Sequence, residues 1–266
     1  MTAPLPDLFT RHSLPKDALA DNKVEELFSV AGRVVAGPAC NIDSPASCLA
    51  FVHALARAPY NVTRVNALIN NASIQAPGPV ATDDADEALT NDDLASIQPA
   101  AGLTPGSTFD QGFERVMHTN VNGTMFMTRA LLPLLEQAAS PEDPARVLIV
   151  SSVMGISVGP FDSNFAYSAS KAAAVHLSRA LASYFTTVAP IAVNALALGY
   201  FKTEMTEVIT RNERFQELIL GATVGGREAH AQDLAAAVIY LLSRGGAYVN
   251  GTVLTVDGGF ALRSRV

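Results

Sequence analysis

The 266-residue sequence lacks several features that mark particular classes of protein. It has two cysteines, Cys40 and Cys48, and no Cys-x-x-Cys pair, whereas a disulfide framework or a structural zinc site would need more ligands. We therefore expect no metal site, and two buried free thiols in a reducing compartment. Basic residues are also scarce: 18 Lys and Arg face 25 Asp and Glu, giving a net charge of −7. This balance argues against nucleic acid and anionic membrane surfaces as partners.

Long apolar runs are missing as well. No stretch reaches the roughly 18 uninterrupted apolar residues of a membrane span. The N-terminus is interrupted by Pro4, Pro6 and Pro15 and has no basic start followed by an apolar run, so we expect no secretory signal. These absences predict a soluble cytoplasmic protein.

Short apolar runs alternate with helical patterns along the rest of the chain, and 49% of the residues are hydrophobic. Continuous apolar strands separated by helices predict an α/β fold with a doubly wound, Rossmann-like parallel sheet covered on both faces. We expect strands at Arg33–Ile42, Val65–Asn70, Arg146–Ser151, Ile191–Leu198 and Thr252–Val256. We expect helices at Pro45–Ala58, Phe109–Gln137, Phe165–Val188 and Ala231–Ser243.

We expect one domain over residues 1–266, with 1–31 as an atypical N-terminal segment and 108–266 as the catalytic half. Residues 81–107 read as an acidic insertion, because residues 81–100 hold six acidic side chains and no basic one. A charge run of this kind favours a solvated loop or a short polar helix. A lid over a pocket is the alternative.

The strongest chemical signal is Tyr167 and Lys171, four residues apart at the start of a predicted helix. This spacing places both side chains on one helix face. A nearby ammonium lowers the pKa of a phenol from its usual value of about 10, and such a pair can transfer a proton. Taken alone the pair also fits a packed Tyr ring and a Lys stem lying over apolar surface.

Other polar residues follow predicted strands in a suggestive order. Ser151 and Ser152 end a strand, where a hydroxyl can donate to an oxyanion or simply cap loose backbone groups. Asn120 lies inside a predicted long helix, where Asn is unfavourable. The helix there is either kinked with room for a water, or Asn120 is a capping or core amide. Residues 70–73 (Asn-Asn-Ala-Ser) follow a buried strand, either as a turn that a flat ring can approach or as a plain turn.

With these motifs in this order, the chain resembles the short-chain dehydrogenase/reductase family from about Arg33 to Gly259. The family shows an Asn-Asn-Ala-Gly turn, a helical Asn, a strand-end Ser and Tyr-x-x-x-Lys in sequence. Within it, the segments Leu-Pro-Leu-Leu-Glu from Leu132 and Ser-Val-Met-Gly-Ile-Ser from Ser152 are most similar to 3-oxoacyl-[acyl-carrier-protein] reductases of the rhamnolipid type.

The resemblance implies a role for each matching residue. Tyr167 would be the general acid/base, and Lys171 would lower its pKa and hold the nicotinamide ribose. Ser152 would stabilise the substrate oxygen, and Asn120 would anchor a proton-relay water. The cofactor, NADP(H) or NAD(H), would be bound by Asn71, Ala72, Ser73, Tyr167, Lys171 and Thr203. Relatives pair the two long helices across a two-fold axis, which implies a homodimer or homotetramer.

The pattern breaks at the N-terminus, where no glycine precedes Gly32. The family begins with a strand and a glycine-rich turn that holds the pyrophosphate at a helix N-terminus. About one βαβ unit is missing here, so we expect the Arg33–Ile42 strand to pair beside Val65–Asn70 or to leave a gap. The adenine-contacting Asp of the family aligns with Asn41. A natural compact variant, a pseudoenzyme or non-redox catalyst, and a gene prediction lacking a coding segment all stay open.

The sequence thus predicts an oxidoreductase that reduces a ketone of 3-oxoacyl or polyketide-like type with NAD(P)H. The alternatives are a proton-transfer catalyst without a dinucleotide and a catalytically inactive binding protein.

Overall fold

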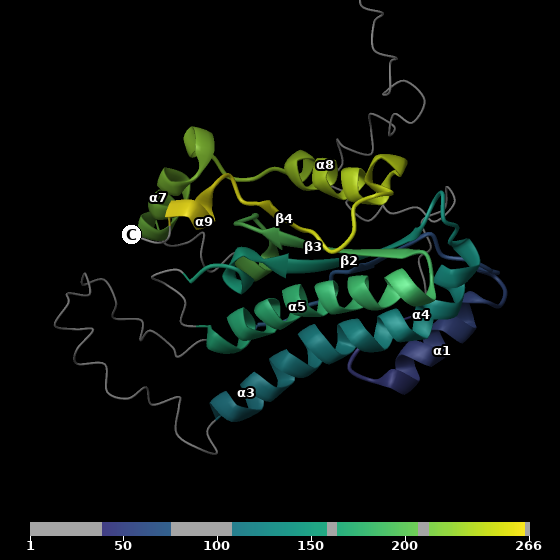
Figure 1. The fold of residues 1–266 in the computed structure, drawn as a ribbon. Helices are drawn as coiled ribbons and strands as arrows, with labels where there is room; N and C mark the ends of the chain where they lie inside the picture. Colours follow the sequence, from purple (N-terminus) through teal and green to yellow (C-terminus); the bar gives the residue numbers. More distant parts are fainter. Residues whose placement is uncertain (1–38, 76–107, 159–163, 207–212, 264–266) are drawn as a thin grey trace, which may run out of the picture.

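The computed structural model describes residues 39–75, 108–158, 164–206 and 213–263. Its centre is a four-stranded sheet in the order β1-β2-β3-β4, with every neighbouring pair parallel (Figure 1). The strands are β1 (Ala67–Asn70), β2 (Ala145–Ser152), β3 (Ile191–Leu198) and β4 (Val253–Val256). β2 and β3 are paired over their whole length, from Ala145 opposite Ile191 to Ser152 opposite Leu198. The predicted parallel α/β fold is confirmed.

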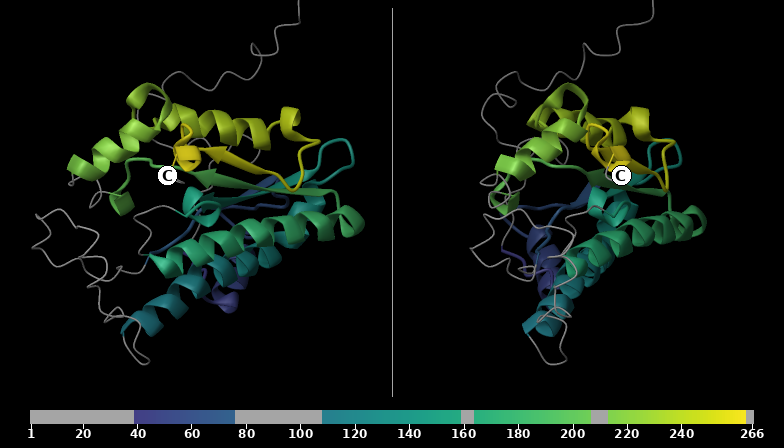
Figure 2. Two further views of the ribbon diagram at one scale, coloured as in Figure 1. Left: turned by 60° about the vertical axis from the view of Figure 1, so that its left-hand side comes forward. Right: turned by 90° about the vertical axis from the view of Figure 1, so that its left-hand side faces the viewer.

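Helices cover both faces of this sheet, as Figures 1 and 2 show. One layer holds α1, α3, α4 and α5, and the opposite layer holds α7, α8 and α9. The helices are α1 (Pro45–Leu55), α3 (Thr108–Met117), α4 (Thr124–Ala138), α5 (Phe165–Val188), α7 (Glu213–Ala222), α8 (Ala231–Leu242) and α9 (Phe260–Arg263). Short turns of other helix types are η2 (His118–Gly123), η3 (Val153–Gly155), η4 (Glu204–Thr206), η5 (Val224–Gly226) and η6 (Arg244–Gly246). Within the described ranges, no helix is long and apolar enough to cross a membrane.

The two apolar cores follow from the alternation of side chains along the central strands. Val147 and Ile149 of β2 lie in a buried cluster with residues of α1, α4 and α5. Leu148, between them, packs in a second cluster with Val238 and Leu241 of α8. Every residue of β2 and β3 except Val150 and Leu198 is buried, which explains why both strands read as continuous apolar runs.

Most predicted elements lie where the sequence placed them. Helix α5 and strand β3 begin and end at the expected residues, and α8 ends one residue early. The long helix expected over Phe109–Gln137 is instead divided into α3, the π-helical turn η2 and α4. Helices α7 and α9 were not predicted. The acidic insertion over 81–107 lies wholly outside the described residues.

The predicted strand over Arg33–Ile42 is not found where it can be checked. Residues 33–38 lie outside the described part of the chain, and Ala39 to Ile42 are not in a strand. The Ser44 N–H donates to the Asn41 carbonyl at 3.2 Å, and the Asp43 N–H donates to the Asn41 side chain at 3.1 Å. The Asn41 side chain therefore forms a local turn that competes with sheet pairing.

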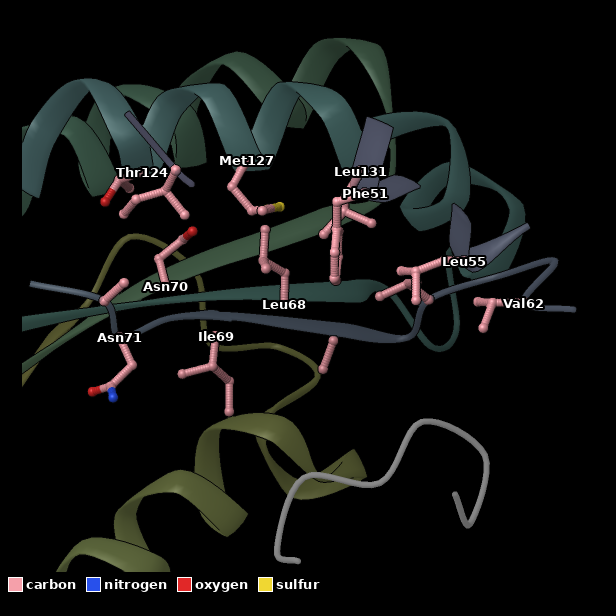
Figure 3. A pocket seen from close by; sticks show the side chains of 14 residues that line it. Phe51, Leu55, Val62, Leu68, Ile69, Asn70, Asn71, Thr124, Met127 and Leu131 are labelled. Carbon is pink, nitrogen blue, oxygen red and sulfur yellow. The ribbon is translucent and has the colours of Figure 1, made fainter. Parts of the chain in front are cut away.

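A cavity of about 280 Å³ lies beside β1 (Figure 3). Among the described residues β1 pairs with β2 alone, so its other edge faces this space. In Figure 3, Leu68 of β1 and Met127 of α4 point toward each other, with Phe51 of α1 close by. Asn70, Asn71 and Ala72 line the end of the cavity at the carboxyl end of the strand.

We predict that Asn194→Ala lowers the free energy of unfolding by about 2–4 kcal/mol. Asn194 is 2% exposed in β3, and its amide donates to the Val249 carbonyl at 2.8 Å and accepts from the Thr252 N–H at 3.0 Å. Its removal leaves two backbone groups without those partners. Denaturant titration measures the change. The exposed Asn66→Ala is the matched control, expected within about 0.5 kcal/mol of wild type; equal losses in both variants would contradict the prediction.

Candidate active site

The carboxyl ends of β1, β2 and β3 bring the predicted site residues to one edge of the sheet. Asn71 follows β1, Ser151 and Ser152 end β2, and the chain leaving β3 leads to Thr203. Helix α5 begins after β2 and brings Tyr167 to the same edge. Ligands of open α/β sheets bind at this edge, so the sheet topology positions these residues for binding.

Helix α5 starts with a side-chain cap that fixes Tyr167. The Asn164 side chain accepts the Tyr167 N–H at 3.2 Å, a typical N-cap contact. Lys171 follows on the same face, with its Nζ 5.4 Å from the centre of the Tyr167 ring. The predicted shared face of Tyr167 and Lys171 is therefore confirmed.

Lys171 is buried, with 4% of its surface exposed. Its Nζ donates to the Val150 carbonyl at 2.9 Å. Burial disfavours the charged ammonium and lowers the pKa of Lys171 to about 8. The Lys171 side chain therefore loses its charge at a lower pH than an ordinary surface lysine does.

The Tyr167 phenol behaves differently from the sequence-based expectation. Burial raises its pKa, and a hydrogen bond with the Ser152 side chain acts in the opposite direction. The structure does not show the predicted lowering by Lys171. The Lys171 ammonium donates to Val150 and lies over the ring, and its own charge is disfavoured by burial.

The two serines at the end of β2 divide the functions that the sequence left open. The Ser151 hydroxyl donates to the Lys171 carbonyl at 2.8 Å and so joins the strand end to α5. Ser152 Oγ accepts the Met154 N–H at 3.2 Å, which is a capping contact, and also bonds to the Tyr167 phenol. Ser152 thus combines a backbone cap with a place beside the phenol.

Asn120 lies in the π-helical turn η2 and is 3% exposed. Its amide accepts the Ile74 N–H at 2.8 Å and donates to the Ile74 carbonyl at 2.9 Å and to the Ser170 hydroxyl at 2.9 Å. The helix is broken here by the π-helical turn, and the contacts of Asn120 are those of a core amide. They leave the role of Asn120 as a water anchor a prediction.

The segment after β1 faces the turn that carries Thr203. Gln75 donates from Nε2 to the Met205 carbonyl at 3.1 Å, which joins the two segments. Thr203 is exposed, and its N–H and hydroxyl both contact the Thr206 hydroxyl. Asn71 and Ala72 are exposed, whereas Ser73 Oγ is buried and has no hydrogen-bond partner among the described residues.

Two contributors to the site were not recognised in the sequence. Asn164 could have been found, because an Asn just before an expected helix start is an N-cap signal. Ser170 carried no signal. It is fully buried, accepts from Asn120 and donates to the Tyr167 carbonyl at 2.7 Å, and only the packing of η2 against α5 shows this.

Comparisons with known proteins agree with this geometry. The family model described as Enoyl-(Acyl carrier protein) reductase matches residues 95–261. The chain is also 33% identical over 246 residues to the short-chain dehydrogenase/reductase VdtF of Byssochlamys spectabilis, a match that covers 83% of this chain and 75% of that protein.

The chain belongs to the short-chain dehydrogenase/reductase family.

Another relative in the family is the rhamnolipids biosynthesis 3-oxoacyl-[acyl-carrier-protein] reductase of Pseudomonas aeruginosa. It is 40% identical over 166 residues, which is 61% of this chain and 64% of the relative's own length. Among solved structures, the Pseudomonas aeruginosa RhlG/NADP active-site complex has a TM-score of 0.66 and 32% identity. That match covers 84% of this chain and 75% of the solved one. The predicted family is confirmed.

The described residues of this short-chain dehydrogenase/reductase fit the nicotinamide end of a dinucleotide. Lys171 makes one hydrogen bond from an ammonium that has three N–H donors. The buried Ser73 hydroxyl has no partner among the described residues. The Lys171 ammonium and the Ser73 hydroxyl thus both have hydrogen-bonding capacity left over among the described residues, at the carboxyl edge of the sheet. Such donors are chemically suited to a ribose and a carboxamide. The fit to the pyrophosphate end depends on residues 1–38, which lie outside the described part.

We predict that, as the pH rises from 8 to 10, the free energy of unfolding of the wild-type chain increases relative to that of Lys171→Met. The folded pKa is about 8 and the ordinary value is 10.5, so in this window the unfolded chain binds more protons than the folded chain. Stability therefore rises with pH, by about 1 kcal/mol per pH unit. Above pH 10 the raised pKa of Tyr167 acts in the opposite direction.

Denaturant titrations at several pH values measure this difference. The exposed Lys202→Met is the matched control for the loss of a lysine charge. A difference between wild type and Lys171→Met that stays constant between pH 8 and pH 10 would contradict the prediction.

Proposed function

We propose that this chain reduces the ketone of a 3-oxoacyl or similar small carbonyl compound with NAD(P)H. The observation that carries the proposal is the hydrogen bond between the Tyr167 phenol and Ser152 at the end of β2. The buried Lys171 ammonium lies over the Tyr167 ring. Ser152, Tyr167 and Lys171 are placed on rigid elements, a strand end and a helix start. Such a site can hold a carbonyl oxygen and supply it with a proton.

The side chains act on the carbonyl oxygen in this scheme. Burial keeps the Tyr167 phenol protonated at neutral pH, which is the state needed to donate a proton to a forming alkoxide. Ser152 holds the same oxygen through its hydroxyl, and Lys171 holds the ribose through N–H groups that Val150 leaves free. The dinucleotide, when bound, supplies the hydride.

Asn120 has an indirect place in this proposal. It fixes the backbone of Ile74, and hence the segment that contains Asn71, Ala72 and Ser73, against η2. We propose that this segment and Thr203 contact the nicotinamide end of the cofactor. The Gln75–Met205 hydrogen bond supports the proposal, because it holds the two segments together.

The substrate class rests on relatives. A 40% identical relative is named a 3-oxoacyl-[acyl-carrier-protein] reductase, which favours a 3-oxoacyl thioester as the first compound to test. A homodimer or homotetramer, cytoplasmic location and a polyketide-like substrate remain predictions. Proton transfer without a dinucleotide is the alternative, favoured by the lack of any glycine before Gly32.

We predict that Tyr167→Phe lowers carbonyl reduction by at least about 10²-fold, because the positioned proton donor is lost. The assay follows NADPH consumption with a 3-oxoacyl thioester at high NADPH concentration. Tyr184→Phe, on the exposed side of the same helix, is the matched control and should keep wild-type turnover. Unchanged turnover in Tyr167→Phe would contradict the assignment of Tyr167, and a wild-type chain that binds NADPH but reduces none of a panel of 3-oxoacyl thioesters and simple ketones would contradict the proposed function.

We also predict that this chain binds NADPH weakly, with a dissociation constant above the low micromolar range. A glycine turn lets backbone N–H groups reach the pyrophosphate, and this sequence has no glycine before Gly32. Each charge-assisted hydrogen bond to phosphate contributes about 1.5–3 kcal/mol. Losing two or three weakens binding by about two to six powers of ten.

Isothermal calorimetry with NADPH measures this affinity, and Lys171→Met should weaken it further. A low-micromolar dissociation constant for the wild-type chain would show that another segment rebuilds the phosphate site. Absence of NADPH binding at millimolar concentration would favour the non-redox alternative.

A further inference from the structure

The chain's two cysteines lie next to each other at the start of α1. The Ser47 hydroxyl is 3.9 Å from Cys40 Sγ, and the following residue is Cys48, whose Sγ is 3.8 Å from the Ile42 carbonyl. Both thiols belong to the same apolar cluster on the α1 side of the sheet. Both are free in this structure, as the sequence suggested, although Cys40 is only half-buried.

A reversal of the backbone brings the two thiols together. The Ser44 N–H donates to the Asn41 carbonyl at 3.2 Å, and the Asn41 N–H donates to the Ser47 hydroxyl at 3.0 Å. The first turn of α1 is thereby folded back over Cys40. The hydrogen bonds that define this turn do not involve either sulfur as a required partner, so the turn can persist when the thiols change.

The two thiols differ in their exposure to solvent. Cys48 is fully buried, whereas Cys40 is partly exposed to solvent. Burial first, and then the charge and hydrogen bond of Cys40, raise the pKa of Cys48 to about 11, and Asp43 adds to this effect. The contacts of Cys40 with Ser47 and of Cys48 with Ile42 place the two residues on facing sides of the same turn. Cys40 is the accessible thiol, and Cys48 is a protected neighbour.

We propose that Cys40 and Cys48 form a reversible intramolecular disulfide when the protein meets a peroxide. In the first step the Cys40 sulfur attacks a peroxide oxygen, the O–O bond breaks, and Cys40 becomes a sulfenic acid as one water leaves. In the second step the Cys48 sulfur attacks the Cys40 sulfur, the S–S bond forms and the S–O bond breaks. The departing oxygen takes the Cys48 proton and leaves as a second water. A small thiol reduces the bond by exchange.

The disulfide would pin the turn that carries Asn41 and Ile42 against α1. Ile42 lines the cavity beside β1, so the modification fixes one part of the lining of that cavity. It involves neither Tyr167 nor Lys171. The proposal is therefore independent of the proposed reductase function.

Mass spectrometry of the intact wild-type chain tests the proposal. Trypsin releases residues 34–57 as one peptide that contains both cysteines, because no Lys or Arg lies between Arg33 and Arg57. After mild peroxide treatment at slightly alkaline pH, this peptide should lose the mass of two hydrogen atoms and both thiols should resist alkylation. Dithiothreitol should restore both. Two peptides cross-linked between chains, added oxygen on Cys40, or an unchanged peptide would each overturn the proposal.

Single-cysteine variants provide the matched control. In Cys48→Ser the peroxide should add oxygen to Cys40 and leave no mass loss in the peptide. In Cys40→Ser the buried Cys48 should remain an unmodified thiol under the same treatment. Ready oxidation of Cys48 in Cys40→Ser would overturn the assignment of Cys40 as the point of entry. The wild-type result decides the proposal even if a variant fails to fold.

Discussion

The close approach of Gly155 to the backbone of Lys171 is the contact on which the site depends. A Cβ at position 155 would lie 2.5 Å from the Lys171 carbonyl carbon, so a side chain there would push η3 away from α5. The approach lets the Ser151 hydroxyl donate to the Lys171 carbonyl and lets Lys171 Nζ donate to Val150. The end of β2 and the first turns of α5 are thereby joined by contacts in both directions. Ser152, Tyr167 and Lys171 take their places from this junction.

A second constraint places the segment after β1 on the same edge. The π-helical turn η2 turns Asn120 inward, where its amide binds both backbone groups of Ile74 and the Ser170 hydroxyl. Ser170 lies on α5 and donates to the Tyr167 carbonyl. One buried polar network therefore links the β1 segment, η2 and α5. Such a network is stabilising because its members are satisfied, and costly to disrupt for the same reason.

The sequence predicted well those parts whose structure is set by local patterns. Helix α5 and strand β3 were placed to the residue, because a continuous apolar run and a long helical period have clear ends. The helix expected over Phe109–Gln137 is divided at η2, which realises one of the alternatives that the unfavourable Asn120 suggested. By contrast, the expected strand ending at Ile42 failed over its last residues, because the Asn41 side chain forms a local turn there. The order of the motifs was enough to recognise the family.

What the sequence missed depends on long-range packing. The turn that brings Cys40 against Ser47, and Ile42 against Cys48, is a backbone reversal that spacing alone does not reveal. The raised pKa of Tyr167 and the lowered pKa of Lys171 both come from burial, which the spacing of the two residues does not reveal. The short helices α7 and α9, which lie near each other, were also missed.

Saturation-transfer NMR with NADPH tests the central claim, that Tyr167, Ser152 and Lys171 form a site for the nicotinamide end of the cofactor. Protein protons are saturated, and the signal transferred to each part of bound NADPH is compared. The account predicts stronger transfer to the nicotinamide ring and its ribose than to the adenine, and loss of that transfer in Lys171→Met. Transfer concentrated on the adenine, or a nicotinamide signal that survives in Lys171→Met, would contradict it.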